Sequence, residues 1–337
     1  MIRANAIAIT LIFAVSCLGQ QRIPSPNTPC EFLAASPDFS IIAATARPPY
    51  LRAWNLKTSR RLWTSFAGRL GPFKSLAFHS SKRVMVTGSW GDGLGVNIWD
   101  AETGEHIRSI QLEDVNAMDL HPESDRIAIS TEASRLYIAS LDGSEPVLLE
   151  SKEVKWDVAF SPDGKLLATA SGERIKIWDL ASRSVIITLP TRPGSRPWFD
   201  RSAQLWKQVW QVHFSQDGTK LVSGTDGYIQ VWDVANWHEL AFAKSGGTPK
   251  SLSMSEDGKN VAWTNRKGEM LLWSGGRRGP RRILPKGSAW RAVFSPTFDR
   301  VVYSKGGKLF QLNLVTGKTE SIISCDYRDA MTESKDQ

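Results

Sequence analysis

The feature of this 337-residue chain that most limits its fold is a repeat of about 40 residues. One unit is clear between residues 158 and 180. It consists of two short apolar strands around a Pro-Asp-Gly turn, followed by a third strand that ends in Trp178-Asp179. In such a turn Pro presets φ, Asp bonds back to the backbone and Gly adopts a positive φ. Short β-branched runs bounded by turn residues are typical of strands. The repeat therefore indicates an array of small sheets.

The unit occurs seven times between residues 30 and 325. Its third strand ends at a marker position with successive spacings of 45, 40, 39, 54, 41 and 39 residues, and the markers are Trp54, Trp99, Ala139, Trp178, Trp232, Trp273 and Leu312. A small sheet that is apolar on both faces cannot bury them alone, whereas radial stacking covers each face with a neighbour. We expect an all-β fold, a seven-bladed β-propeller with four antiparallel strands per blade.

These repeats resemble the WD-repeat β-propeller family. The Trp-Asp dipeptide occurs at Trp99-Asp100, Trp178-Asp179 and Trp232-Asp233. The sequence departs from the family pattern because it contains no Gly-His dipeptide. The family's hydrogen-bond network of Asp, His, Ser and Trp is therefore incomplete in every blade, and we expect apolar packing to hold the blades together. The resemblance implies protein-partner scaffolding, a role in which this fold is rarely catalytic.

Residues 1–19 are typical of an export signal. Arg3 is followed by an apolar run over residues 7–15, which is shorter than the ~20 residues needed to span a bilayer. Two interpretations stay open. Cleavage after Gly19 would release a soluble exported protein, whereas residues 13–17 resemble a bacterial lipobox in which Cys17 is lipidated and tethers the protein to a membrane. Either way we expect an exported protein, in the bacterial periplasm, in the envelope or secreted.

The remaining cysteines, Cys30 and Cys325, suggest how the ring closes. The chain begins with an innermost strand and ends with an outermost one, so no strand is left to cross between the ends. Alignment of the repeats places Cys325 level with Leu112 and Cys30 level with Val115, in the connection between neighbouring blades. Oxidising conditions outside the cytoplasm favour a disulfide at this place. The alternative is two unrelated thiols. Residues 326–337 are polar and charged, and we expect a flexible tail.

The search for catalytic and metal-binding patterns finds little. The five His have no metal-ligand spacing, and the chain has no phosphate loop or nucleophile elbow, so we expect no metal and no cofactor. The formal charge of +8 is spread along the sequence, and we expect no nucleic-acid partner. Asp119 and His213 occupy a small-residue position of the inner strands and are weak channel candidates. They support the alternative of a secreted hydrolase-like or lactonase-like enzyme, against a role in which channel water or a neighbouring blade satisfies them.

A stronger candidate is the face that carries the connections between blades, the loop face. Four residues before the inner-strand aromatic, the chain carries Trp156, Trp210, Trp290, Lys74 and Lys250, and Arg291 follows Trp290. An insertion over residues 190–207 adds Trp198, Phe199 and Arg201. Aromatic and cationic side chains around a concave mouth are typical of interface hot spots; the alternative is that the Trp side chains cap the core. We expect a non-catalytic extracytoplasmic module that binds a protein partner, with a peptide or a glycan as other ligands.

Overall fold

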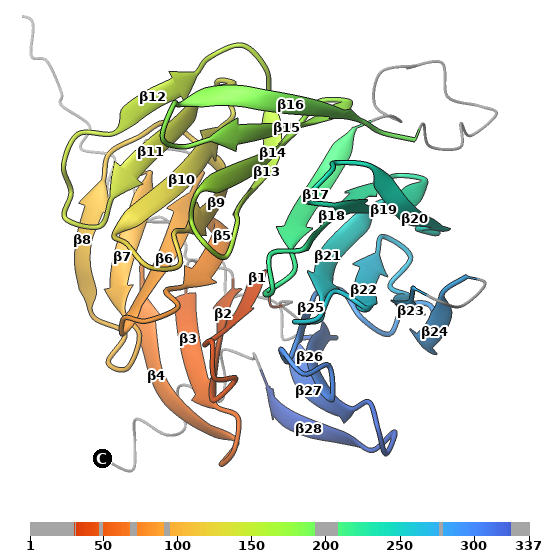
Figure 1. Cartoon of the computed structure of the whole chain (residues 1–337). Coiled ribbons are helices and arrows are strands. Elements are labelled where there is room, and N and C mark those ends of the chain that lie inside the picture. The colour runs from red at the N-terminus through yellow and green to blue at the C-terminus, as the bar shows by residue number, and fades with distance from the viewer. Residues whose placement is uncertain are drawn as a thin grey trace, which may run out of the picture.

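The structure is a computed structural model that describes residues 30, 32–46, 50–67, 73–90, 95–192, 208–275 and 279–324. The described residues form seven separate antiparallel sheets of four strands each, and every sheet is built from four strands that are consecutive in the chain. Figure 1 shows these sheets arranged around a common centre. The predicted all-β, seven-bladed β-propeller is confirmed.

The blades follow one another in chain order, and in each blade the first strand lies nearest the centre (Figure 1). Blade 1 contains β1 (Phe32–Ala35), β2 (Ile41–Ala46), β3 (Tyr50–Asn55) and β4 (Arg60–Phe66). Blade 2 contains β5 (Phe73–Phe78), β6 (Val84–Ser89), β7 (Val96–Asp100) and β8 (His106–Ile110). Blade 3 contains β9 (Val115–Leu120), β10 (Arg126–Thr131), β11 (Leu136–Ser140) and β12 (Val147–Glu150). Blade 4 contains β13 (Lys155–Phe160), β14 (Leu166–Ser171), β15 (Arg174–Asp179) and β16 (Ser184–Pro190). Blade 5 contains β17 (Val209–Phe214), β18 (Lys220–Thr225), β19 (Tyr228–Asp233) and β20 (Glu239–Lys244). Blade 6 contains β21 (Pro249–Met254), β22 (Asn260–Asn265), β23 (Met270–Ser274) and β24 (Arg281–Leu284). Blade 7 contains β25 (Ala292–Phe294), β26 (Arg300–Lys305), β27 (Lys308–Asn313) and β28 (Thr319–Ser324).

The apolar core is divided among the blade interfaces. Each pair of neighbouring blades shares a cluster of buried side chains, as stacking of two-faced apolar sheets requires. Between blades 7 and 1 the cluster joins Cys30, Ile42 and Trp54 to Val302 and Leu309, and all five are at most 2% exposed. The ring is therefore closed by apolar packing, without a strand exchanged between its ends.

Part of the hydrogen-bond network expected from the family resemblance is present. In the three blades that carry Trp-Asp, the buried indole Nε1 donates to a hydroxyl on the neighbouring strand, and the pairs are Trp99 to Thr87 at 2.9 Å, Trp178 to Thr169 at 3.2 Å and Trp232 to Ser223 at 3.1 Å. These bonds satisfy indole donors that would otherwise be buried without a partner. The network thus retains its Trp and Ser/Thr members although the Gly-His dipeptides are missing.

Two histidines replace serine at the turn after the inner strand. In blade 4, Ser161 Oγ accepts a hydrogen bond from the backbone N–H of Leu166 at 2.9 Å. In blade 3, His121 Nδ1 accepts from the backbone N–H groups of Glu123 and Ser124, both at 3.1 Å. His121 Nε2 also lies 3.1 Å from the carbonyl oxygen of Gly164 in blade 4. The histidine therefore closes its own turn and contacts the next blade.

A search of the described residues finds no helix that is long and apolar enough to cross a membrane.

Candidate functional site

A cavity of about 490 Å³ opens at the centre of the loop face, and we call it the loop-face mouth. All seven blades contribute to its lining, in chain order through Phe32, Lys74, Asn116, Trp156, Trp210, Lys250 and Arg291. The ring therefore gathers side chains that are far apart in the sequence around one concave surface.

An irregularity shared by the inner strands explains why these side chains meet. The pairing register with the second strand shifts between Lys155 and Asp157 in blade 4 and between Val209 and Gln211 in blade 5. The same shift occurs in blades 2, 3 and 6. A β-bulge of this kind leaves one residue unpaired and redirects its side chain. The skipped residues are Lys74, Asn116, Trp156, Trp210 and Lys250, and all of them line the mouth.

The aromatic part of the mouth is a tryptophan pair. The ring centroids of Trp156 and Trp210 lie 5.1 Å apart at an interplanar angle of 46°. The guanidinium carbon of Arg266 lies 5.9 Å from the Trp210 centroid. Both indole Nε1 atoms are buried and have no hydrogen-bond partner. Because an unsatisfied buried donor costs about 1–3 kcal/mol, these groups favour a bound acceptor.

The cationic part lies on blades 6 and 7. Lys250 Nζ is 5.4 Å from the ring centroid of Trp290, and Arg291 Cζ is 4.5 Å from that of Phe32. Arg291 also donates a hydrogen bond to the backbone carbonyl of Lys250. Burial, together with the positive charges of Arg291 and Arg266, lowers the pKa of Lys250. In the part of the chain that the structure describes, no carboxylate forms an ion pair with Lys250 or Arg266.

The opposite side of the mouth is already neutralised. Lys74 forms an ion pair with Glu132, and its Nζ lies 4.9 Å from the ring centroid of Trp90. The hydrogen bond from Lys74 outweighs the effect of burial and lowers the pKa of Glu132. Lys74 therefore lines the mouth as predicted, but its charge is paired.

Two carboxyl groups connect the inner strands below the mouth. Asp119 accepts hydrogen bonds from the backbone N–H of Leu120 at 2.9 Å and of Phe160 in blade 4 at 2.7 Å. Asp157 accepts one from the backbone N–H of Val212 in blade 5 at 3.0 Å. Burial raises the pKa of Asp119 to about 6 and that of Asp157 to about 7. Each carboxyl group thus satisfies the free edge of the next inner strand.

The weak channel candidates are not brought together. Asp119 on β9 and His213 on β17 are separated by blade 4, and no hydrogen bond or ion pair of the described residues joins their side chains. His213 is exposed to solvent within the ring, and burial by the surrounding chain lowers its pKa. The described residues also contain no group of three His, Cys, Asp or Glu that could hold a metal ion.

A buried ion network anchors the strand that carries Trp156. Lys155 Nζ lies 2.9 Å from Glu150 Oε2 and donates to the backbone carbonyls of Glu153 at 2.6 Å and Ser134 at 3.2 Å. Lys176 Nζ lies 2.8 Å from Glu150 Oε1. The side chain of Lys155 is 0% exposed. Since Glu150 belongs to blade 3 and both lysines to blade 4, the network joins these blades beside the mouth.

Sequence reasoning missed Arg266, Asp157 and Asn116. A signal existed for Asn116, which occupies in blade 3 the position of Trp156 in blade 4. Arg266 lies in the turn between β22 and β23, where the repeats share no pattern. The predicted residues Trp198, Phe199, Arg201, Cys17 and Cys325 lie outside the described residues, so their roles stay predictions.

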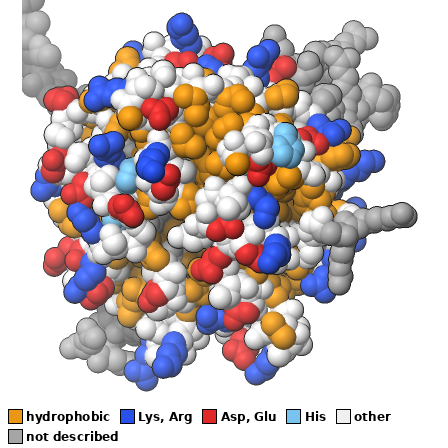
Figure 2. All heavy atoms as spheres, in the orientation of Figure 1, with side chains coloured by type: hydrophobic (Ala, Val, Ile, Leu, Met, Phe, Trp, Pro, Cys, Tyr) orange, Lys and Arg blue, Asp and Glu red, His pale blue; other side chains and the backbone are white. Residues whose placement is uncertain are grey.

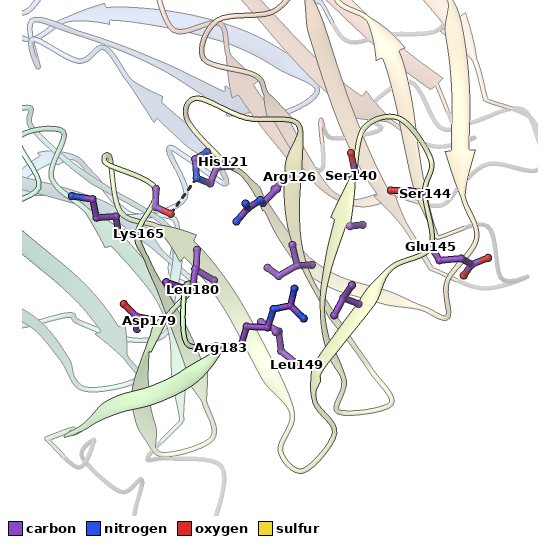
Figure 3. Close-up of a pocket in the computed structure, with 15 residues that line it drawn as sticks. His121, Arg126, Ser140, Ser144, Glu145, Leu149, Lys165, Asp179, Leu180 and Arg183 are labelled. Carbon is purple, nitrogen blue, oxygen red and sulfur yellow. Dashed lines mark hydrogen bonds between the residues drawn. The ribbon is translucent and has the colours of Figure 1, made fainter.

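A second hollow, of about 670 Å³, lies between blades 3 and 4 on the opposite face. Figure 3 shows the side chains of Arg126 and Arg183 pointing into it near Leu149 and Leu180. A similar hollow of about 470 Å³ occurs between the corresponding elements of blades 5 and 6. This recurrence indicates that such hollows follow from blade stacking. Figure 2 shows charges of both signs interspersed over the visible face, so the excess of basic residues is not concentrated there.

The fold and the mouth define the chain as a seven-bladed repeat propeller with a central binding-type cavity. A family model described as "WD domain, G-beta repeat" matches residues 136–179 and 200–233. Together with the seven-bladed fold and the relatives below, this match shows that the chain is a WD-repeat β-propeller. Propellers of this family are typically non-catalytic protein-interaction scaffolds.

Several curated relatives carry WD-repeat names or similar repeats. The protein LST8 homolog of Drosophila melanogaster is 26% identical over 241 residues, which cover 66% of this chain and 72% of that protein. The WD repeat-containing protein SL1-17 of Schistosoma mansoni is 30% identical, with 44% of this chain and 50% of that protein covered. The small ribosomal subunit protein RACK1y of Oryza sativa subsp. japonica is 26% identical over 46% of this chain and 45% of that protein. The chain thus spans about half the length of the latter two relatives.

Proposed function

We propose that this propeller is a non-catalytic scaffold that binds a protein partner at the loop-face mouth. The observation that carries the proposal is the convergence of Trp156, Trp210 and Lys250 around one cavity, each placed there by a β-bulge. Paired indole rings offer a large rigid contact area, and their unpaired N–H groups add hydrogen-bonding specificity. Trp290 is 45% exposed and extends this aromatic surface beyond the cavity.

The proposal includes the predicted location outside the cytoplasm and a protein ligand rather than a glycan. Support for export comes from Arg3, the apolar run over residues 7–15 and the cysteine arrangement. Cys30 is fully buried between blades 7 and 1, which is where a disulfide to Cys325 would reinforce the closure. The mass of the mature protein distinguishes cleavage after Gly19 from lipidation of Cys17. Two free thiols in the unreduced mature protein would refute the disulfide.

A capture experiment tests the binding proposal. The native protein is crosslinked in its host cells, and the captured proteins are compared between the wild type and single Trp156→Ala and Trp210→Ala variants. We expect a partner that is captured by the wild type and lost with either variant. Phe66→Ala is the control, because Phe66 is an exposed aromatic residue (58%) on the outer strand β4. Capture that is unchanged in both Trp variants would refute the loop-face mouth as the binding site.

A further inference from the structure

The unsatisfied polar groups of the loop-face mouth show which ligand chemistry it lacks. Besides the indole N–H groups of Trp156 and Trp210, Asn116 Nδ2 is buried without a partner, and so is the hydroxyl of Ser75, which can donate. Gln211 Oε1 is an acceptor in the same state. N–H and O–H donors therefore outnumber acceptors among these groups, so the mouth is suited to an acceptor-rich ligand.

The charges of the mouth are unbalanced in the same sense. Lys250, Arg266 and Arg291 are close enough for the two guanidinium groups to lower the pKa of Lys250 by repulsion, in addition to the larger effect of burial. Within the described residues, no carboxylate forms an ion pair with Lys250 or Arg266. An anion placed between them would remove this repulsion and gain charge-assisted hydrogen bonds.

The nearest acidic group of the mouth does not supply that anion. The carboxyl group of Asp157 already accepts the backbone N–H of Val212, and it is a protein group fixed in β13. Glu132 is occupied by Lys74 on the other side of the mouth. The cation cluster of blades 6 and 7 is therefore open to an external carboxylate.

We infer that the loop-face mouth binds an acidic peptide segment, with an Asp or Glu carboxylate of the segment held by Lys250 and Arg266 and its neighbouring residues packed on the Trp156–Trp210 pair. This inference rests on the proposed function and specifies the chemistry of its partner. A peptide fits the site because it combines carboxylates and backbone carbonyls, which are acceptors for the indole N–H groups, with side chains that contact aromatic rings.

A selection from a library of random linear peptides tests the inference. The library is selected separately on the wild type, on Trp156→Ala and on Lys250→Gln, each checked for an unchanged melting temperature. We expect clones that depend on both residues and that are enriched in Asp and Glu. For a fluorescent peptide made from such a clone, Lys250→Gln should raise the Kd about 10-fold, because one charge-assisted hydrogen bond is lost. Lys165→Gln is the matched control, since Lys165 is 79% exposed on the opposite face.

The outcomes separate this inference from the proposed function. Clones that depend on Trp156 but are not enriched in acidic residues would overturn the acidic segment and leave the mouth as a peptide-binding site. Clones that bind equally to all variants would overturn both. Binding of the same acidic peptide that is unaffected by added NaCl would also contradict the inference, because salt screens a contact between a carboxylate and partly exposed cations.

Discussion

Replacement of Glu150 by Gln should destabilise the protein strongly, because it removes the negative charge between two buried lysines. The side chains of Lys155 and Lys176 are 0% and 14% exposed, and both contact the Glu150 carboxylate, which is itself 12% exposed. Gln keeps the size of the side chain and one acceptor oxygen, so the change tests the charge rather than the packing.

The magnitude follows from what Lys155 keeps. Removal of one partner from a buried ion pair costs about 3–5 kcal/mol. Lys155 retains its hydrogen bonds to the backbone carbonyls of Ser134 and Glu153, and Lys176 retains the Glu153 carboxylate at 3.2 Å. We therefore expect a loss of about 3 kcal/mol in the free energy of unfolding, at the lower end of that range.

Urea denaturation followed by tryptophan fluorescence measures this loss. Glu153→Gln is the control, since the Glu153 side chain is 49% exposed and an exposed ion pair contributes about 1 kcal/mol or less. Burial already lowers the pKa of Lys155, while Glu150 opposes that effect. In the Glu150→Gln variant that opposition is gone, so the deficit should shrink as the pH rises and Lys155 loses its proton. Equal losses for the two variants would refute the reasoning.

Two further predictions concern the inner strands and the turns. Because burial raises the pKa of Asp157 from 3.8 to about 7, the folded wild type holds this proton more tightly than the unfolded chain, and its stability should fall between about pH 4 and pH 8. Asp157→Asn should therefore gain stability relative to the wild type as the pH rises from 5 to 8 in urea denaturation, and a difference independent of pH would contradict the assignment. Gly164→Ala should cost about 2 kcal/mol, because the new Cβ would lie 2.0 Å from His121 Nε2. Gly172→Ala should cost about 1 kcal/mol, since its φ is also positive (55°) but no atom lies within 4 Å of the new Cβ. Equal changes in melting temperature for these two variants would show that the His121 contact is unimportant.

The fold could be predicted from the sequence because its determinants are local. Each Pro-Asp-Gly or Ser-containing turn and each short apolar strand lies within one repeat, and the repeats are in phase. Even the hydrogen bond from Trp178 to Thr169 joins residues of one hairpin. Once seven such units are counted, their two-faced apolar sheets leave radial stacking as the arrangement that covers both faces.

The site could be predicted only in part, because its contacts join different repeats. Alignment of the repeats found Trp156 and Trp210 as equivalent positions, and the structure brings their rings into contact. The role of Asp157 depends on Val212, which is 55 residues away in the next blade. Likewise Asp119 looked like a channel acid, but it accepts the backbone N–H of Phe160, 41 residues away. Such partners depend on how neighbouring blades are aligned, which no pattern within one repeat encodes.

The construction of each blade from four consecutive strands has a consequence for the chain ends. Because no blade is assembled from both ends of the chain, a break in any connection between blades leaves every sheet whole. A circular permutant that begins in the connection between β12 and β13, with the present ends joined by a linker between β28 and β1, would keep all seven sheets and the apolar contact between Ile42 and Val302. The position of the chain ends is thus separable from the architecture of the ring.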